Sequence, residues 1–327
     1  MSTLGDPQLY LIIPVFNRLQ SLQLLKQSLE VQSDLDFSVL VVDDGSEPPI
    51  TLTGDRLSVL RVNKGGPASA RNRGVKALPT CASERLLVFI DSDCALPVDY
   101  VRDVKKLFSD LNIQFGGGPD RAPLQSSNFQ KAVDFSMTSF LTTGGLRGGP
   151  YRIARFFPRG GNFVIRERLF LELGGFDESL RFGEDIEFGY RAVAKGVNPE
   201  FFQELFVFHQ RRERLDLFLR QISAAGASKI AIARKTNGKH SWLHLMLLLL
   251  MVALAALLVL QPLICLLILI FYGVLVGILA GARYGSWWVA LMAPAVACLQ
   301  HLFFGLGIMT GLFGRAQVAK GSGERQW

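Results

Sequence analysis

The sequence predicts an α/β domain, with a mostly parallel sheet and flanking helices, followed by a C-terminal α-helical membrane region. Three observations lead to this prediction. Short apolar runs alternate with segments of helical spacing up to about residue 238, several of these runs end in acidic residues, and the chain from Leu243 onward is almost free of charge. Strands that alternate with helices are typical of a parallel sheet covered by helices.

The predicted elements of the first half follow the order strand, helix, strand, strand, helix, strand, helix. The apolar runs are the strands, and the first helix carries Leu22, Leu25 and Leu29 on one face. In chain order these elements are Leu9–Ile13, Arg18–Gln32, Phe37–Val42, Leu57–Val62, a helix from the glycine-rich turn at Gly65 to Leu78, Leu86–Ile90 and Val98–Leu111.

The second half of this region is less regular. Glycines cluster between Gly116 and Gly161, including Gly148-Gly149, and a stretch of this length is typical of a binding loop or lid. The predicted elements are helices at Asn128–Leu141, Glu167–Leu173, Asp185–Lys195 and Leu215–Arg234, and strands at Asn162–Arg166 and Phe201–His209.

The C-terminal region predicts membrane insertion. Arg283 is its only formal charge between Leu243 and Phe313. The apolar runs Leu243–Leu260, Leu263–Ala280 and Trp287–Phe313 are each long enough for the hydrocarbon core, which takes about 20 apolar residues. Two arrangements remain open: three spans, or a two-span hairpin at Gln261-Pro262 with the third run re-entrant or interfacial. The second keeps the basic tail (Arg315, Lys320, Arg325) on the inside.

The net charge of +7 is explained by topology rather than by nucleic-acid binding. Basic residues concentrate in an amphipathic helix at about 214–238 and just before it, where they are attracted to anionic lipid and mark the cytoplasmic side. No stretch interleaves basic and aromatic residues as a nucleic-acid site would. The residues concerned are Arg211, Arg212, Arg214, Arg220, Lys229, Arg234, Lys235 and Lys239.

The cysteines and the N-terminus indicate a reducing compartment. Cys81, Cys94, Cys265 and Cys298 lack metal-ligand spacing and are expected to be reduced packing residues. No signal segment begins the chain, so we expect a multi-pass protein of the cell (inner) membrane with its first domain in the cytoplasm. The predicted boundaries are 1–238 for this domain and 239–327 for the membrane region.

Two aspartates follow the most apolar strand. Asp91 and Asp93 come directly after Leu86–Ile90, where open α/β sheets bind ligands. Carboxylate oxygens suit Mg²⁺ or Mn²⁺, which in turn hold a diphosphate. An ordinary acidic turn is the alternative when these residues are taken alone.

Seven segments in fixed order resemble the family 2 glycosyltransferases, which have the GT-A fold and transfer sugar from a nucleotide donor with inversion. The resemblance covers roughly residues 9 to 235. The segments are IIPVFNR (Ile12–Arg18), VVDDGS (Val41–Ser46), GGPASARNRG (Gly65–Gly74), FIDSD (Phe89–Asp93), GGNFVIR (Gly160–Arg166), GGFDESL (Gly174–Leu180) and GEDIEFGYR (Gly183–Arg191).

The resemblance implies a donor site. Asp44, with Asp43 behind it, accepts a hydrogen bond from the nucleotide base, unless it only forms a turn with Gly45. Arg71 contacts the base or phosphate from a helix start, unless it is a surface arginine. The same pocket is bordered by Pro14, Phe16 and Arg18.

The resemblance also implies a metal and a base. Asp93 ligates a divalent ion, and Asp91 contacts the ribose or the metal. His209 resembles a histidine that some members add to the metal or phosphate site, and a structural or phosphate-facing histidine is an equal alternative here. Asp185, beside Glu184, is the general base, and the alternative is that both acids only favour a helix N-terminus. The sugar is lined by Gly160, Gly161 and Asn162.

The resemblance narrows the function without fixing the acceptor. Processive synthases of this fold carry a Gln-x-x-Arg-Trp motif that the chain lacks, so we expect single transfer. The expected acceptor is a lipid-linked or cell-envelope glycan, because a membrane-attached domain is held near it. A polyprenyl-phosphate sugar synthase remains open, with cations from Arg211–Arg214, and a non-catalytic nucleotide-sugar sensor is less favoured. The sequence leaves the sugar, the nucleotide base and the oligomeric state open.

Overall fold

The computed structural model describes residues 8–80, 83–147, 152–236 and 242–313. These residues form two compact units, each continuous in space but not in sequence. Unit 1 comprises residues up to 121 together with 155–209, and unit 2 comprises 122–154 together with 210–319. The connections between the units therefore follow residues 121, 154 and 209.

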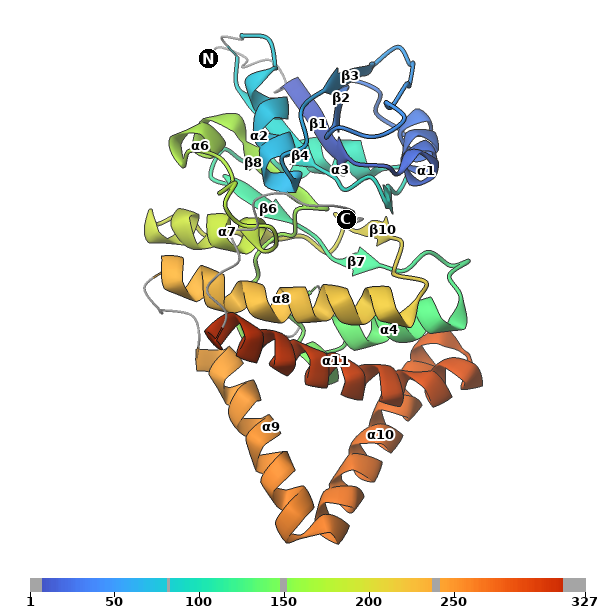
Figure 1. Cartoon of the computed structure of the whole chain (residues 1–327). Helices are drawn as coiled ribbons and strands as arrows, with labels where there is room; N and C mark the ends of the chain where they lie inside the picture. The colour runs from blue at the N-terminus through green and yellow to red at the C-terminus, as the bar shows by residue number, and fades with distance from the viewer. Residues whose placement is uncertain (1–7, 81–82, 148–151, 237–241, 314–327) are drawn as a thin grey trace. The chain divides into compact units, whose positions relative to one another are not determined.

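Unit 1 contains a seven-stranded sheet of order β3-β2-β1-β4-β8-β6-β9 (Figure 1). All its neighbouring strands are parallel except that β8 runs antiparallel to both β4 and β6. The chain moves outward from β1 through β2 to β3, and then returns to place β4 on the other side of β1. Ligands bind at such a reversal, beside the carboxyl ends of the strands. The strands are β1 (Gln8–Val15), β2 (Ser38–Asp43), β3 (Leu57–Arg61), β4 (Arg85–Phe89), β6 (Phe115–Gly117), β8 (Phe163–Arg166) and β9 (Glu200–Phe201).

The two faces of this sheet carry separate apolar cores because successive side chains in a strand point to opposite faces. Leu11 and Ile13 of β1 pack on one face with helices α1 and α3, whereas Ile12 packs on the other with α2, α6 and α7. The second core is aromatic, with Phe89, Phe163, Phe170, Phe176 and Phe188 in mutual contact. These helices are α1 (Leu19–Glu30), α2 (Pro67–Lys76), α3 (Tyr100–Leu107), α6 (Glu167–Glu172) and α7 (Glu184–Ala194).

A second, three-stranded sheet of order β5-β10-β7 differs from the sequence prediction. The single strand expected at Phe201–His209 is wrong: β9 joins β6 in the large sheet, while β10 (Val207–His209) lies between β5 (Cys94–Ala95) and β7 (Asp120–Arg121). The run misled because apolar residues recur through it: Phe201 in β9, Phe202, Leu205 and Phe206 in the turn, and Val207 and Phe208 in β10. The small sheet places His209 opposite Cys94.

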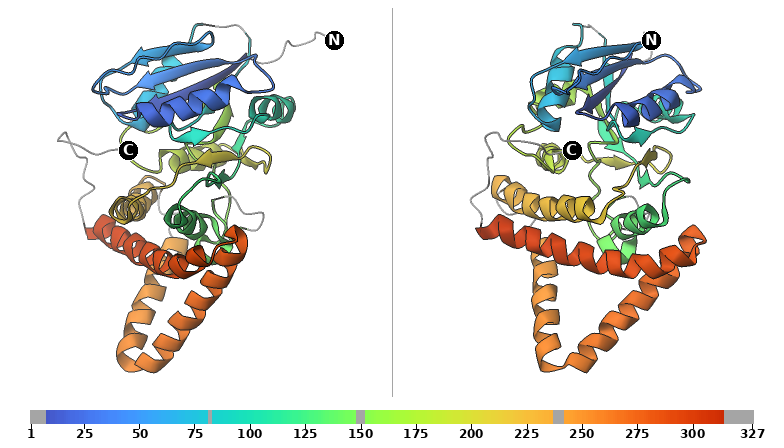
Figure 2. Two further views of the ribbon diagram at one scale, coloured as in Figure 1. Left: turned by 90° about the vertical axis from the view of Figure 1, so that its right-hand side faces the viewer. Right: turned by 45° about the vertical axis from the view of Figure 1, so that its right-hand side comes forward.

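Unit 2 is helical. It contains α4 (Asn128–Thr138), α5 (Phe140–Thr143), α8 (Leu215–Lys235), α9 (Trp242–Leu260), α10 (Pro262–Tyr284) and α11 (Trp287–Phe313). The expected helix at Asn128–Leu141 is divided at Ser139, whose extended backbone ends α4 and caps α5. α9 and α10 form a hairpin that turns at Gln261, and α11 runs beside α8 in every view (Figures 1 and 2).

α8 and α11 touch backbone to backbone at glycines. A Cβ atom on Gly226 of α8 would lie 2.2 Å from the carbonyl oxygen of Phe304, and one on Gly307 of α11 would lie 2.1 Å from that of Ser223. α11 is also fastened to α4, because the Gln300 amide bonds the hydroxyl and the carbonyl of Ser136 at 3.0 and 2.8 Å. α11 is therefore tied to two helices of its own unit along its length.

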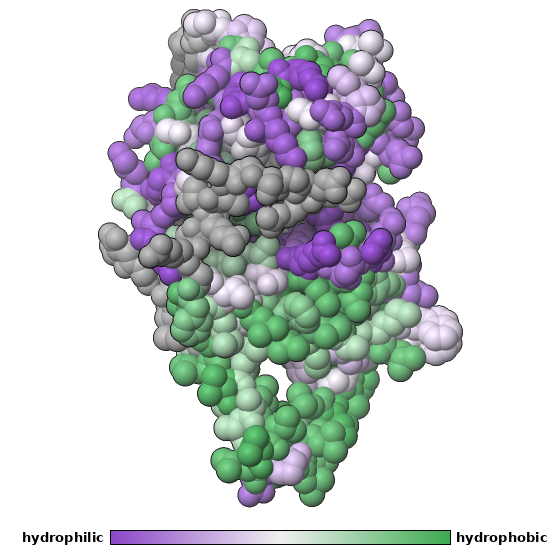
Figure 3. Space-filling view, viewed as in Figure 1, coloured by the Kyte–Doolittle hydropathy of each residue, from purple (hydrophilic) through white to green (hydrophobic). Residues whose placement is uncertain are grey.

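Two described helices, α10 and α11, are long and apolar enough to cross a membrane by length and composition. Leu248–Leu260 of α9 is a shorter apolar helix. Hydrophobic side chains gather on the surface of this hairpin and of α11 (Figure 3). The predicted domain boundary at residue 238 and the basic tail lie outside the described residues and stay predictions, as do Cys81 and Gly148-Gly149.

Candidate active site

The carboxyl ends of three neighbouring strands bring most of the predicted donor residues together. β1 pairs with both β2 and β4, so the chain leaving β1 at Pro14–Arg18 lies between Asp43-Asp44 and Asp91–Asp93. Asn17 takes a positive φ of 53° there, and its backbone N–H donates to the Ser46 hydroxyl at 2.9 Å. The Lys64 ammonium lies 4.0 Å from the centre of the Phe16 ring.

Asp43 and Asp44 are buried and already hold backbone amides. Asp43 accepts from the N–H of Ser46 at 2.8 Å and from the guanidinium of Arg61 at 2.7 Å. Asp44 accepts from Gly65 and Gly66 at 2.7 and 2.9 Å, one on each carboxylate oxygen. Burial raises the pKa of Asp44 above its usual range, although the two amides oppose the rise. Asp43 thus shapes the turn after β2, and Asp44 fixes the glycine turn before α2.

Arg71 links two of the predicted motifs. Its fully buried guanidinium donates to Asp91 at the end of β4 and to Glu184 at the start of α7, at 2.6 Å each. Burial alone would lower the pKa of Arg71, but the charges of Asp91, Glu184 and Asp185 raise it. Arg71 is therefore a permanent cation inside the site. The alternative that it is only a surface arginine is wrong.

The same guanidinium explains Gly160. A Cβ atom there would lie 2.7 Å from an Arg71 nitrogen, and one on Gly161 would lie 2.8 Å from an Asp91 oxygen. The N–H of Gly160 donates to the Asp185 carboxylate at 2.9 Å. The glycine pair lets the backbone pass between the arginine cluster and Asp185.

Glu184 and Asp185 are both buried at the first turn of α7, where the helix N-terminus favours negative charge. Burial raises the pKa of Glu184 to about 7; the Arg71 cation opposes that rise and neighbouring Asp185 adds to it. The other Asp185 oxygen accepts from the N–H of Ile186 at 2.7 Å. Each Asp185 oxygen keeps a lone pair that these contacts do not use.

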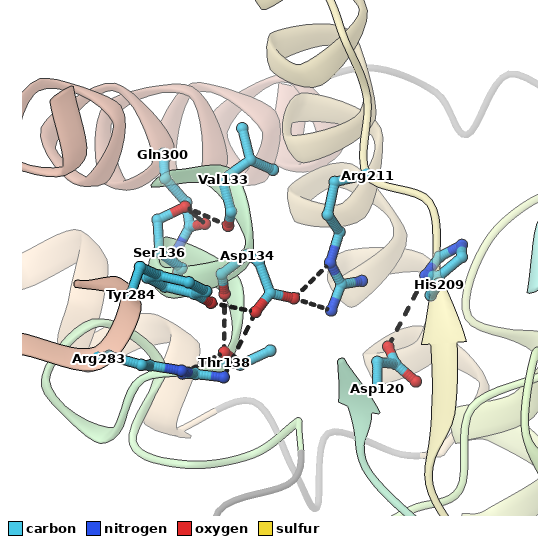
Figure 4. Close-up of polar contacts among 10 residues, drawn as sticks. All are labelled: Asp120, Val133, Asp134, Ser136, Thr138, His209, Arg211, Arg283, Tyr284 and Gln300. Atoms are coloured by element: carbon cyan, nitrogen blue, oxygen red, sulfur yellow. Dashed lines mark hydrogen bonds and ion pairs between the residues drawn. The ribbon is translucent and has the colours of Figure 1, made fainter. Parts of the chain in front are cut away.

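His209 stands between two carboxylates. Its Nε2 lies 3.1 Å from an Asp93 oxygen, and its Nδ1 lies 3.9 Å from an oxygen of Asp120 (Figure 4). Arg18 donates to the other Asp93 oxygen. The small β5-β10-β7 sheet produces this arrangement, because it aligns the chain after Asp93 with the strands that hold His209 and Asp120.

The residues around Asp93 fit a divalent cation. Ligand atoms of Asp93, Cys94 and His209 lie within 4.8 Å of one another. A carboxylate and an imidazole are ligands that Mn²⁺ accepts, and Asp120 behind the imidazole is the second carboxylate that orients many metal-binding histidines. Cys94 is buried, and its Sγ lies 3.7 Å from the Gly161 carbonyl oxygen.

Asn162 differs from its neighbours in the glycine segment. Its side chain is fully buried: it accepts from the Tyr100 hydroxyl at 2.6 Å and donates to the Leu205 carbonyl at 2.6 Å. Both ends of the amide are used inside unit 1. Asn162 therefore braces the strand β8 against α3, and contact with a sugar from this segment falls to the glycine backbone.

The sequence interpretation missed Asp120 and Tyr100. A signal for Asp120 existed, since Gly116–Gly118 and Pro119 precede it. These glycines allow close backbone approach: a Cβ atom on Gly118 would lie 2.0 Å from the carbonyl oxygen of Leu205. The segment was interpreted as a loop, but it holds β6 and β7.

The class of protein follows from comparison with known families. The model of glycosyl transferase family 2 matches residues 10–174, which include the strand-end acids, Arg71 and the glycine pair. The chain belongs to this family, and the predicted resemblance and the GT-A-like α/β fold are confirmed.

Individual relatives are distant. The pre-mycofactocin glycosyltransferase of Mycobacterium tuberculosis is 26% identical over 230 residues, covering 68% of this chain and 47% of that protein. The succinoglycan biosynthesis protein ExoA of Rhizobium meliloti is 26% identical over 220 residues, covering 64% and 65%. An uncharacterized glycosyltransferase of Haemophilus influenzae is 25% identical over 190 residues, covering 55% and 60%. The chain thus matches between about half and two thirds of the length of these relatives.

One solved structure resembles both units. The mannosyltransferase PcManGT from Pyrobaculum calidifontis, in complex with GDP-Man and Mn²⁺, superposes with a TM-score of 0.60 over 94% of this chain and 88% of its own. The identity is 15%, so this likeness establishes the fold alone.

Proposed function

We propose that the protein is a membrane-anchored inverting glycosyltransferase that moves one sugar from a nucleotide-diphosphate donor to a lipid-linked or cell-envelope glycan. The observation that carries this proposal is the Arg71 bridge. One buried guanidinium joins Asp91, at the end of a central strand, to Glu184, beside the candidate base Asp185. Donor-side and acceptor-side carboxylates thereby converge from distant parts of the chain.

The donor lies at the ends of β1, β2 and β4. Asp44 retains lone pairs beside the two glycine amides and is placed to accept from the nucleotide base. Pro14 and Phe16 border this pocket. Arg18 moves from Asp93 to the diphosphate when donor binds, because a phosphate offers it the same bidentate geometry as a carboxylate.

Asp93 and His209, with Asp91 on the donor side, would hold Mn²⁺ or Mg²⁺. A divalent ion held there would supply positive charge that stabilises the departing nucleoside diphosphate. Asp120 orients the His209 ring through its second nitrogen. Support comes from the donor set and from the Mn²⁺ in the structurally similar mannosyltransferase.

Asp185 takes the proton of the acceptor hydroxyl. The hydroxyl oxygen attacks the anomeric carbon from the side opposite the diphosphate, the bond from that carbon to the diphosphate breaks, and the proton passes to the free lone pair of Asp185. Glu184, held by Arg71, is a second buried carboxyl beside the base. Inversion follows because only one displacement occurs.

In the proposed attachment, α9 and α10 span the membrane and α11 lies at the membrane interface. α11 packs along α8, a helix with Arg220, Lys229 and Arg234, which belongs at the level of the lipid headgroups. Unit 1 is then cytoplasmic, and lipid-linked acceptors are available to it on that side. A glycan acceptor also accords with the succinoglycan biosynthesis in the name of the relative ExoA.

The proposal is tested by nucleotide-sugar turnover with the purified full chain in detergent. A panel of UDP-, GDP- and dTDP-sugars is supplied with lipid extract, with Mn²⁺, Mg²⁺ or chelator. We expect release of nucleoside diphosphate from one donor, abolished by chelator. A polyprenyl-phosphate acceptor that suffices by itself would favour the phosphate-acceptor alternative. Binding of donors without turnover of any would contradict the proposal and favour a sensor.

A further inference from the structure

The single charged residue of the apolar C-terminal region lies in a polar cluster of unit 2 that the transfer reaction does not use. Arg283 is in the last turn of α10. It donates to the Thr138 hydroxyl at 2.9 Å and to Asp134 of α4 at 3.3 Å (Figure 4). A charge in such a segment needs a partner, and it marks a functional site when that partner is shared.

Asp134 is shared. Its carboxylate is buried and accepts a hydrogen bond from Nε of Arg211 at 2.8 Å, and a terminal nitrogen of Arg211 forms an ion pair with the same oxygen at 2.7 Å. The other oxygen accepts from the Tyr284 hydroxyl and from Arg283. Arg283 therefore has the longest contact with a carboxylate that other donors already occupy.

The exposures of the three charged groups differ sharply. The side chains of Asp134 and Arg211 are each 1% exposed, whereas that of Arg283 is 39% exposed. The inner edge of the Arg283 guanidinium is held by Thr138 and Asp134, and its remaining surface faces outward. A guanidinium fixed in this way is pre-organised to bind an oxyanion with little further loss of freedom.

The position along α10 indicates which oxyanion is available. The apolar stretch of this helix ends at Arg283, and the end of an apolar span lies at the level of lipid headgroups, where phosphate groups are concentrated. We propose that Arg283 binds the phosphate of a membrane lipid, while Asp134 holds the arginine in place and competes with the phosphate for it. This site does not depend on sugar transfer.

The test measures lipid binding without donor. Full-length protein in a neutral detergent is titrated with phosphatidylcholine, phosphatidylglycerol, a polyprenyl phosphate or inorganic phosphate, and binding is followed by thermal shift and native mass spectrometry. We expect phosphatidylglycerol and the polyprenyl phosphate, which both carry net negative charge, to bind more tightly than phosphatidylcholine. Equal binding of the two supports a site for bulk lipid, and tighter binding of polyprenyl phosphate supports a site for acceptor.

The proposal predicts opposite changes in lipid affinity for substitutions at Arg283 and at Asp134. Arg283→Gln should weaken binding of the anionic lipids about tenfold, which corresponds to about 1.4 kcal/mol, because a charge-assisted hydrogen bond is lost. Asp134→Asn should strengthen binding, because the competing charge is gone. Arg220→Gln removes an exposed charge of α8 that adds only to diffuse attraction at the headgroups, so it should weaken binding far less than Arg283→Gln does.

Three results would overturn the proposal. One is wild-type affinity in Arg283→Gln, and another is an equal loss in Arg220→Gln, which would indicate diffuse attraction. The third is an equal response to inorganic phosphate and to lipid, which would make the site one for soluble phosphate. If Asp134→Asn does not fold, the comparison of Arg283→Gln with Arg220→Gln still decides.

Discussion

The roles of single residues in the candidate active site follow from the hydrogen bonds and ion pairs that they make in the structure. Arg71 is an internal cation with two carboxylate partners, Asp44 fixes a glycine turn, and Asn162 is a brace. Only the motif types could be anticipated from the sequence. The partners of these residues could not be anticipated, because Arg71 and Glu184 are far apart in the sequence and meet only in the folded chain. No local sequence pattern predicts that pairing.

Glu184 gives a pH-dependent stability. Burial raises its folded pKa to about 7 from 4.5, so its contribution is fully favourable below 4.5 and is lost as pH rises through 7. Glu184→Gln removes this loss, which is of the order of 3 kcal/mol in the free energy of unfolding. We therefore expect its melting temperature, relative to wild type, to be higher at pH 8 than at pH 5, as measured by thermal unfolding in detergent.

Glu178 provides the matched control. Burial would raise the pKa of Glu178, but a hydrogen bond from Asn72 and the nearby basic residues Arg73 and Lys76 hold it below its usual value. Its contribution is present above the unfolded pKa of 4.5 and is lost only on acidification below it, so the stability of Glu178→Gln relative to wild type should be about the same at pH 5 and at pH 8. The same change with pH in both variants would contradict the assignment of Glu184.

At the scale of elements, periodicity predicted most helices and central strands, including β1, β2, β4 and α7, to within a few residues. Strand β7 and the division of Phe201–His209 were not predictable, because two- and three-residue strands have no period to detect and exist only through their partners. This failure concealed Asp120, which depends on the small sheet for its place beside His209.

The α8–α11 contact should be sensitive to a single methyl group. Gly307→Ala places a Cβ 2.1 Å from a backbone oxygen of Ser223, so the helices must separate. We expect a loss of about 1–3 kcal/mol in unfolding free energy, visible as a lower melting temperature in detergent. Gly273→Ala on α10, whose Cβ would lie 3.7 Å from Pro294, should be neutral or stabilising. Equal melting temperatures for the two variants would show that the helices are not packed in this way.

At the scale of the whole molecule, composition alone separated the charged region from the apolar one, but it could not assign α4 and α8. Both helices belong to the same compact unit as the apolar hairpin, although both lie within the predicted first domain, residues 1–238. Their tie to that unit is made by Gln300, Asp134 and the glycines of α8 and α11, which are tertiary contacts. The compact unit that holds the apolar hairpin therefore includes more of the chain than the apolar runs.

The proposed transfer reaction depends on Asp185 as its general base. Asp185→Asn keeps the size of the side chain but cannot take a proton, whereas Glu187→Gln changes an acid on the same helix that pairs with Arg191. For each variant, donor affinity is measured by calorimetry with Mn²⁺, and turnover by release of nucleoside diphosphate.

We predict that Asp185→Asn binds donor within a few-fold of wild type and loses turnover by a factor of 10² or more, in the range expected for a general base. Glu187→Gln should retain turnover. Wild-type turnover in Asp185→Asn would contradict the central claim and would favour a phosphate acceptor that needs no base.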